Sequence, residues 1–157
     1  MNSVRLSKKR LMLILGPSFR RNKRSEPLPA LERYDGLFFR VARKYLANTK
    51  NVDVIVMKDD LTLVEGTALL AYEPPKGDRW IMHPLSGDEI KAGKIKNEPF
   101  LKRKLHGNKC QEVFLAMGKR YAEALPDLSQ FNVNVVFPTC GGLGPKAKAL
   151  KEWLRRR

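Results

Sequence analysis

Two runs of apolar residues in the first third of the chain predict buried strands. Residues 11–15 form the first run, which ends at Gly16 and Pro17, and residues 52–57 form the second. Between them, residues 36–48 place apolar side chains on one side at helical spacing, with basic side chains opposite. This succession of strand, helix and strand predicts two parallel strands joined by a right-handed connection.

The patterns in the middle of the chain are weaker. Asp35 stands directly before the first helical pattern and is its candidate N-cap. Residues 61–72 fit either a strand with a bend or a short helix, and the sequence does not choose between them. Between residues 73 and 103, Pro, Gly, Lys and Asp dominate, so we predict an excursion from the sheet in which only residues 78–84 are locally ordered.

The last third of the chain predicts a helix, a strand and a closing helix. Residues 108–125 repeat apolar side chains at near-helical spacing, which predicts a helix that Pro126 ends. Residues 131–157 indicate a buried strand, a glycine-rich turn and a basic helix with Pro145 in its first turn. The first N–H groups of that helix would face the turn, so the turn is a candidate phosphate or nucleobase site. The alternative is a strand-to-helix connection without a ligand, and both interpretations remain open.

No repeat, low-complexity segment or linker divides the chain. Its 157 residues and 43% hydrophobic content suit one α/β domain with a mostly parallel sheet. We therefore predict a single domain over residues 1–157, in which residues 1–9 form a basic N-terminal tail. The apolar run at 11–16 is too short to span a bilayer, so no membrane partner is expected.

The charge balance points to a polyanionic partner. Lys and Arg number 31 against 16 Asp and Glu, which gives a formal net charge of +15 and a pI near 10.1. Part of this excess fits a solvated face or disordered ends, but residues 20–24 and 94–104 are also basic. The distributed excess favours DNA or RNA as the partner and leaves the oligomeric state open.

The cysteine and histidine residues give no sign of a metal site. Cys110 and Cys140 belong to no CxxC pair, and neither His83 nor His106 has a second ligand at metal-binding spacing. We therefore expect no metal, no cofactor and a reducing, cytoplasmic setting. Cys140, in the glycine-rich turn, is interpreted as a structural or ligand-lining thiol, with a nucleophile as the alternative.

Several stretches together resemble a known family. They are the first strand with its Ser and Arg/Lys loop, LILGPSFRRNKR, and then PLPALERYDGLFFRVARKYL, VIVMKDDLTLV, AYEPP and VFPTCGGLGPKAKALKEWL. This pattern resembles a family of small uncharacterised proteins that is similar to the uracil-DNA-glycosylase-like domain of archaeosine synthase. The resemblance excludes residues 76–106, and this chain has Gly16, Pro17 and Ser18 where members commonly carry a Cys-Ser pair. It implies a uracil-DNA-glycosylase-like, three-layer α/β/α fold with a mostly parallel sheet.

A glycosylase-like reaction would need a carboxylate near the sugar and a pocket for the departing base. Asp59 and Asp60 follow the second predicted strand and are the candidate catalytic residues, ahead of Asp35 and Glu65. The alternative roles are ordinary ones, because Asp59 and Asp60 suit a turn, Asp35 a helix cap and Glu65 a surface charge.

The candidate nucleic-acid-binding residues lie in or beside the predicted strand-end loops and the closing helix. Aromatic side chains there would stack on bases, although core packing is their alternative fate, and cations would contact phosphates. The glycine-rich turn is expected to form one wall of a shared pocket. The full set is Ser18, Phe19, Arg20, Arg21, Lys23, Arg24, Tyr34, Lys58, Tyr72, Gly141, Gly142, Gly144, Lys146 and Lys148.

Two functions follow from these residues. The first is a nucleic-acid-binding protein with a glycosylase-like base or nucleotide pocket, whose candidate reaction is N-glycosidic bond cleavage or base modification. The alternative is a noncatalytic recognition module that assists a separate RNA- or DNA-modifying enzyme. A third class, an enzyme acting on free nucleosides or nucleotides, leaves the net charge of +15 poorly explained.

Overall fold

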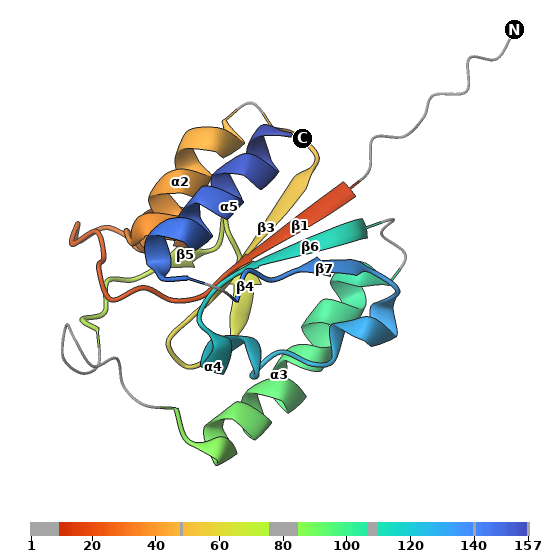
Figure 1. Ribbon diagram of the computed structural model, residues 1–157. Helices are drawn as coiled ribbons and strands as arrows, with labels where there is room; N and C mark the ends of the chain where they lie inside the picture. The colour runs from red at the N-terminus through yellow and green to blue at the C-terminus, as the bar shows by residue number, and fades with distance from the viewer. Residues whose placement is uncertain (1–9, 48, 76–84, 107–109, 140, 157) are drawn as a thin grey trace, which may run out of the picture.

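A five-stranded sheet forms the centre of the computed structural model, which describes residues 10–47, 49–75, 85–106, 110–139 and 141–156 (Figure 1). In spatial order the strands are β4 (Leu63–Glu65), β3 (Val52–Met57), β1 (Arg10–Leu15), β6 (Cys110–Ala116) and β7 (Asn134–Val136). The pairs β3–β1, β1–β6 and β6–β7 are parallel, whereas β4 is antiparallel to β3. The predicted α/β class with a mostly parallel sheet is confirmed.

Strand β1 is buried along its apolar run because helices pack against both faces of the sheet. Its alternate side chains belong to two separate hydrophobic clusters, with Leu13 in one and Ile14 in the other. In the parallel register, Leu13 lies opposite Val54 of β3 and Phe114 of β6. The continuous apolar pattern of this strand therefore reflects burial from both sides.

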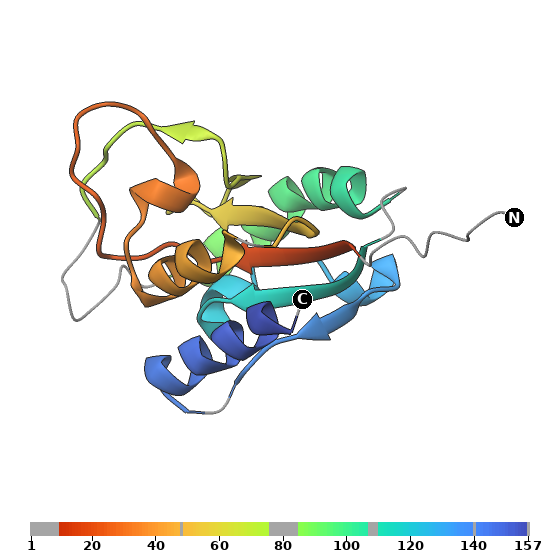
Figure 2. The same ribbon diagram turned by 90° about the horizontal axis from the view of Figure 1, so that it is seen from above.

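The helices divide between the two faces of the sheet (Figures 1 and 2). On one face, α2 (Leu37–Leu46) and α5 (Leu143–Arg155) lie side by side, next to the short α1 (Ala30–Arg33). The other face is covered by α3 (Gly87–Leu105), α4 (Lys119–Ala122) and the 3-10 helix η1 (Leu128–Phe131). One contact that holds α5 on the sheet joins Trp153 of α5 to Phe114 of β6, whose ring centres lie 5.2 Å apart.

The predicted helix at 108–125 is wrong, because its first half is strand β6. Val113, Phe114 and Leu115 are all buried, since β6 lies between β1 and β7 and is covered on both faces. A strand buried on both faces has no alternating pattern, and its apolar run can match a helical spacing by chance. Only residues 119–122 of the predicted helix are helical.

The predicted irregular excursion at 73–103 is also wrong in its second half, where α3 begins after Ser86. The hydroxyl of Ser86 accepts a hydrogen bond from the Glu89 N–H, and the Glu89 carboxylate accepts one from the Ser86 N–H, each 3.1 Å long. This capping box was the sequence signal of a helix start. Pro99 inside the helix obscured it, and residues 78–84 lie outside the described residues.

The helix predicted after Asp35 is confirmed, but its predicted N-cap is wrong. The N-cap of α2 is Gly36, which has no side chain to cap the helix, and Asp35 binds arginine side chains instead. For residues 61–72 the strand-and-bend alternative is correct. β4 is followed by β5 (Leu69–Leu70), which pairs with β2 (Leu28–Pro29) in a separate two-stranded sheet.

The closing segment has the predicted order of strand, glycine turn and helix. Gly142 is the N-cap of α5 and Pro145 lies in its first turn. The strand, however, is not buried as predicted, because β7 is the edge strand and Val135 is 38% exposed. The first of the expected strand residues, Phe131, belongs to η1.

Candidate functional site

The carboxyl ends of β1, β3 and β6 lie at the same edge of the sheet, which we call the strand-end edge. β1 lies between β3 and β6, although the chain passes through β1, β3 and β6 in that order. The chain after β1 packs on the α2–α5 face, whereas the chain after β6 packs on the α3 face. Open α/β sheets bind ligands at such a topological switch point.

A hollow of about 520 Å³ occupies this place, and we call it the switch-point pocket. Its volume is within the range of small-molecule and cofactor sites. The pocket combines aromatic and apolar side chains with two exposed arginines. Its lining includes Gly16, Ser18, Phe19, Arg20, Phe38, Arg40, Met117, Tyr121 and Leu143.

Ser18 fixes the loop that forms one side of the switch-point pocket. Its hydroxyl donates to the Arg20 carbonyl at 2.7 Å and accepts from the Gly36 N–H at 3.2 Å. A Cβ on residue 36 would lie 2.7 Å from the Ser18 Cβ, so only glycine permits this close approach. The hydroxyl is therefore engaged in holding the loop against the start of α2.

Asp35 gathers three arginines beside the same pocket. One of its carboxylate oxygens lies 3.1 Å from Arg40 and 3.6 Å from Arg20, while the other lies 2.5 Å from Arg43. Hydrogen bonds from Arg40 and Arg43 hold the pKa of Asp35 below its ordinary value, although partial burial opposes this. The cluster keeps a net positive charge next to the pocket, because one carboxylate faces three guanidinium groups.

We expect Asp35→Asn to lower the melting temperature at neutral pH but not in acid. A carboxylate whose pKa is depressed by folding stabilises the protein above its unfolded pKa of about 3.9, and this stabilisation disappears as pH falls through the folded pKa. Thermal unfolding of wild type and variant between neutral pH and about pH 2.5 measures the effect. Glu32→Gln, at an exposed carboxylate of α1, is the control. An equal deficit at every pH would contradict the expectation.

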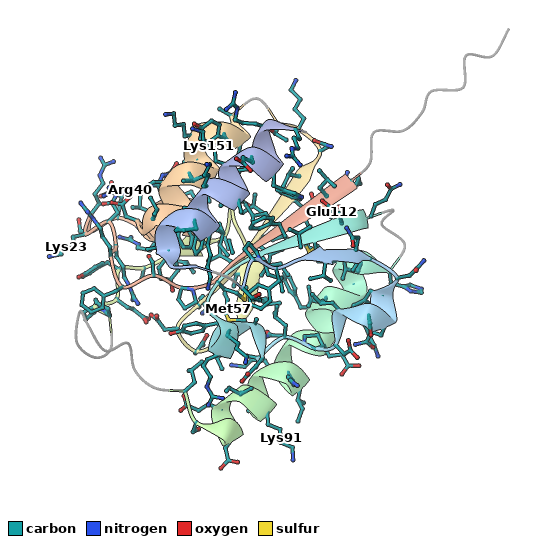
Figure 3. The ribbon with its side chains drawn as sticks, in the orientation of Figure 1. Lys23, Arg40, Met57, Lys91, Glu112 and Lys151 are labelled. Atoms are coloured by element: carbon teal, nitrogen blue, oxygen red, sulfur yellow. The ribbon has the colours of Figure 1, made fainter. Side chains whose placement is uncertain are left out.

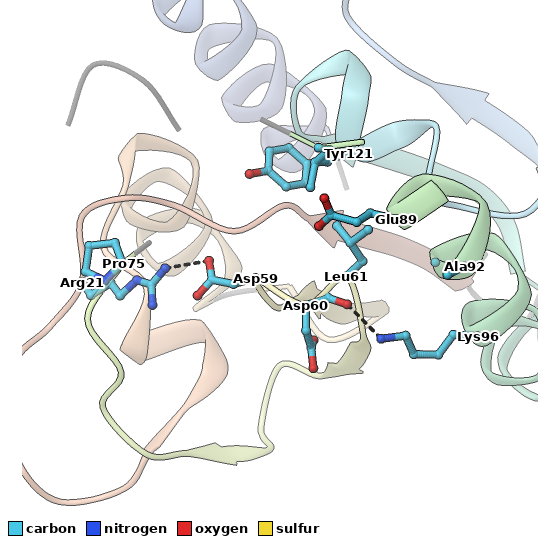
Figure 4. Close-up of a pocket in the computed structure, with 11 residues that line it drawn as sticks. Arg21, Asp59, Asp60, Leu61, Pro75, Glu89, Ala92, Lys96 and Tyr121 are labelled. Atoms are coloured by element: carbon cyan, nitrogen blue, oxygen red, sulfur yellow. Dashed lines mark hydrogen bonds and ion pairs between the residues drawn. The ribbon is translucent and has the colours of Figure 1, made fainter. Parts of the chain in front are cut away.

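A partly buried ion pair lies at the end of β3 (Figure 4). The Arg21 guanidinium lies 2.6 Å from the Asp59 carboxylate, and the Arg21 side chain is only 4% exposed. Arg21 also donates to the carbonyls of Ser18 and Glu73, and its guanidinium lies 5.1 Å from the centre of the Tyr34 ring. Asp59 therefore holds a cation that ties the loop after β1 to β3.

Asp59 borders two smaller hollows beside this ion pair. One, of about 260 Å³, is also lined by Glu89, Lys96 and Tyr121 (Figure 4), and the other, of about 320 Å³, by Tyr34 and other residues. Burial raises the pKa of Tyr121, and the negative charge of Asp59 raises it further. Tyr121 thus keeps its proton as a hydrogen-bond donor, and it lines the switch-point pocket as well.

Asp60 has the contacts of a turn residue. Its carboxylate accepts a hydrogen bond from the Thr62 N–H at 3.0 Å, and its side chain is 57% exposed. Partial burial would raise the pKa of Asp60, but hydrogen bonds from Thr62 and the charges of Lys58 and Lys96 lower it overall. Asp60 is consequently ionised at neutral pH and does not carry a proton to donate.

Arg33 is a residue of the site that sequence reasoning missed. Arg33 is the last residue of α1 and is only 2% exposed. Its guanidinium lies 5.7 Å from the centre of the Tyr72 ring. It donates hydrogen bonds of 2.6 to 3.2 Å to the backbone carbonyls of Asn22, Arg24, Glu26 and Leu70. The sequence carries no signal for this role, because an arginine in a short helix is usually exposed.

Tyr34 is a buried residue that packs on Phe39, and the remaining candidates divide into three groups. The first group lines the switch-point pocket together with Ser18, and it comprises Phe19 and Arg20. The second group is exposed and lies away from the pocket lining, and it comprises Lys23, Arg24, Gly141, Gly142, Gly144 and Lys148. The third is half-buried and comprises Lys58, beside Asp59 and Asp60, Tyr72, beside Arg33, and Lys146, on α5.

The glycine-rich turn does not form the expected pocket wall. Ser18 and Asp59 line different hollows, although Tyr121 lines both of these. Gly142 lines neither hollow, and its neighbour Leu143 lines the switch-point pocket. The φ angle of Gly141 is +84°, a left-handed conformation that favours glycine. These contacts fit a strand-to-helix connection, and Cys140 lies outside the described residues.

The described part of the chain contains no group of three His, Cys, Asp or Glu side chains that could hold a metal ion. Among the same residues, no helix is long and apolar enough to cross a membrane. No protein-family model, no curated protein and no solved structure matches the chain.

Proposed function

We propose that the protein binds nucleic acid at the strand-end edge, with a nucleobase or a terminal nucleotide in the switch-point pocket. The observation that carries this proposal is the composition of that pocket, where Phe19 and Phe38 lie with Arg20 and Arg40. Aromatic rings stack on bases, and arginines contact phosphates or stack on base planes. The net charge of +15 supports a polyanionic ligand rather than a neutral one.

We further propose that recognition, rather than cleavage, is the role of this site. Asp59 is occupied by the Arg21 guanidinium at 2.6 Å, and Asp60 belongs to an exposed turn. Both contacts support structural roles for the two candidate acids. The helices on both faces of the parallel strands support the uracil-DNA-glycosylase-like architecture, which by itself implies no particular reaction.

The base-cleaving alternative rests on one feature of the site. The hollow next to Asp59 also holds the protonated Tyr121, so a carboxylate and a proton donor face the same space (Figure 4). In such a pair the carboxylate would stabilise a cationic sugar and the phenol would donate a hydrogen bond to the departing base. Release of free base from an oligonucleotide by wild type, lost in Asp59→Asn while binding survives, would establish this alternative.

Binding itself is tested with labelled single- and double-stranded RNA and DNA, by fluorescence anisotropy over a range of salt concentrations. We expect Arg20→Gln to weaken binding and to reduce the salt slope by about one unit. Phe19→Ala should cost about 1 to 3 kcal/mol if a base stacks on that ring. Both variants are compared under identical conditions with Lys91→Gln, which removes an exposed charge from α3 on the other face of the sheet (Figure 3).

Two results would refute the proposal. The first is the absence of binding to all four nucleic acids at low salt, where electrostatic attraction is strongest. The second is an equal loss of affinity in Arg20→Gln and Lys91→Gln, because net charge alone would then account for binding. Circular dichroism of each variant establishes that the fold is retained.

A further inference from the structure

A row of cations runs over the outer surface of α2 and α5, and we call it the basic ridge. It consists of Lys44 on α2 with Lys148, Lys151 and Arg155 on α5. The α5 members are three and four residues apart, so they lie on one face of that helix. Glu152 is the only carboxylate in these two described helices.

The ridge cations lack acidic partners within the described residues. No ion pair joins any of the four to a carboxylate there, whereas Lys102 and Lys104 of α3 pair with Glu98 and Glu65. The ammonium groups of Lys44 and Lys151 instead converge on one ring, at 5.5 and 5.6 Å from the centre of Tyr45. Two cations from two helices thus lie against the same ring, and no ion pair joins either of them to a carboxylate among the described residues.

The phenol of Tyr45 reports the positive potential of the ridge. Partial burial would raise the pKa of Tyr45, but a hydrogen bond with Lys151 and the charges of Lys151, Lys44 and Arg155 lower it. Neighbouring like charges destabilise a helix. Lys44 and Arg155 lie in the last turns of their helices, where a cation favours the helix dipole, but Lys148, Lys151 and Arg155 repel one another along α5. A bound anion would relieve that repulsion.

The ridge is continuous with the switch-point pocket. Arg40 of α2 and Leu143 at the start of α5 line the pocket, and both helices run from there along the sheet (Figure 1). The 13 residues of α5 extend over about 20 Å at about 1.5 Å per residue. That length, from the pocket to the far end of the ridge, corresponds to about six phosphates of a strand with duplex-like stacking, at an axial rise of about 3.4 Å.

We infer that the basic ridge binds the phosphate backbone of a strand whose base or terminal nucleotide occupies the switch-point pocket. The ligand is therefore a polynucleotide with several nucleotides beyond the pocket, not a free nucleotide. This inference rests on the proposed function, because it assigns a second contact surface to the same nucleic acid.

The test compares Lys148→Gln/Lys151→Gln with Lys91→Gln/Lys94→Gln, which removes the same charge from exposed positions on α3. Binding of single-stranded oligouridylates of 4 and 16 nucleotides is measured over a range of salt concentrations. For the longer strand, we expect the ridge variant to lower the salt slope by about 1.4, or about 0.7 for each lost phosphate contact. The α3 variant should keep the wild-type slope, and the ridge variant should bind the two lengths with more similar affinities than wild type does.

A spectroscopic readout gives independent evidence. Bound phosphates should raise the pKa of Tyr45 by opposing the lysine charges, which ultraviolet titration detects as the difference between wild type and Tyr45→Phe. Unchanged slopes in the ridge variant, with binding still lost in Arg20→Gln, would overturn the ridge and leave the proposed function intact. Failure of wild type to bind either oligouridylate would overturn the ridge. Failure to bind any of the four nucleic acids as well, including when anionic vesicles of phosphatidylserine bind instead, would overturn the proposed function too.

Discussion

Arg33→Met will destabilise the protein by about 3 kcal/mol and loosen the loop after β1. The side chain is 2% exposed and donates to four backbone carbonyls, three of which belong to residues 22–26. Hydrogen bonds from a charged donor contribute more than neutral ones, and methionine leaves these acceptors without a partner. Urea unfolding gives the free energy, and amide exchange shows whether residues 22–26 open first.

The matched variant is Arg33→Lys, which keeps the charge but not the planar fork of donors. An ammonium group cannot reach four carbonyls in the arrangement that the guanidinium occupies, so we expect only partial rescue. Arg24→Met removes an exposed guanidinium of the same loop, 68% exposed in its ion pair with Glu26, and should change stability little. Equal stability of Arg33→Met and wild type would show that Arg33 does not organise the loop.

Asp59→Asn will cost about 3 kcal/mol of stability, whereas Asp60→Asn will cost less than about 0.5 kcal/mol. The first change leaves the Arg21 guanidinium, 4% exposed, without its carboxylate partner. The second affects a side chain that is 57% exposed and that contacts Thr62 and Lys58 within its turn. Chemical denaturation of the two variants under the same conditions measures the difference, and equal losses would contradict the assigned roles.

A double-mutant cycle with Arg21→Met and Asp59→Leu separates the ion pair from its surroundings. Because the double variant leaves no buried charge unpaired, it should be less destabilised than the sum of the single variants, by about 1 to 3 kcal/mol. Additive losses would show that the two side chains do not stabilise each other. The denaturation of Asp59→Asn is also the control for the base-release test, since an unfolded variant would lose base release for structural reasons alone.

The elements that could be predicted from the sequence are those with a complete local signal. β1 contains a continuous apolar run after Arg10, and the run of β3 is interrupted only by Asp53, while the glycine and proline after residue 15 mark the end of the first. α2 has one apolar and one basic side, and the glycines before α5 with Pro145 in its first turn indicate where that helix starts. Each of these signals lies within a few residues of the element it describes.

The missed elements depend on neighbours that are distant in the sequence. β6 is a strand because β1 and β7 provide its hydrogen bonds and two helical layers cover its faces, so its apolar run resembled a helix. In α3, Asn97 is buried, and its side-chain amide forms hydrogen bonds with the backbone of Leu61 and Leu63. No apolar pattern in the sequence marks this polar residue as internal. Pro99 further weakened the helical pattern of this segment.

The amino-acid sequence alone determines the excess of positive charge, the buried strands β1 and β3, and the loops that follow them. The parallel order of the strands then brings those loops to one edge of the sheet. Only the tertiary structure assigns partners to the charges at that edge. Arg21 meets Asp59 across 38 positions of the chain and Arg33 meets the Leu70 carbonyl across 37, because hydrogen bonds and ion pairs depend on distance in space rather than along the chain.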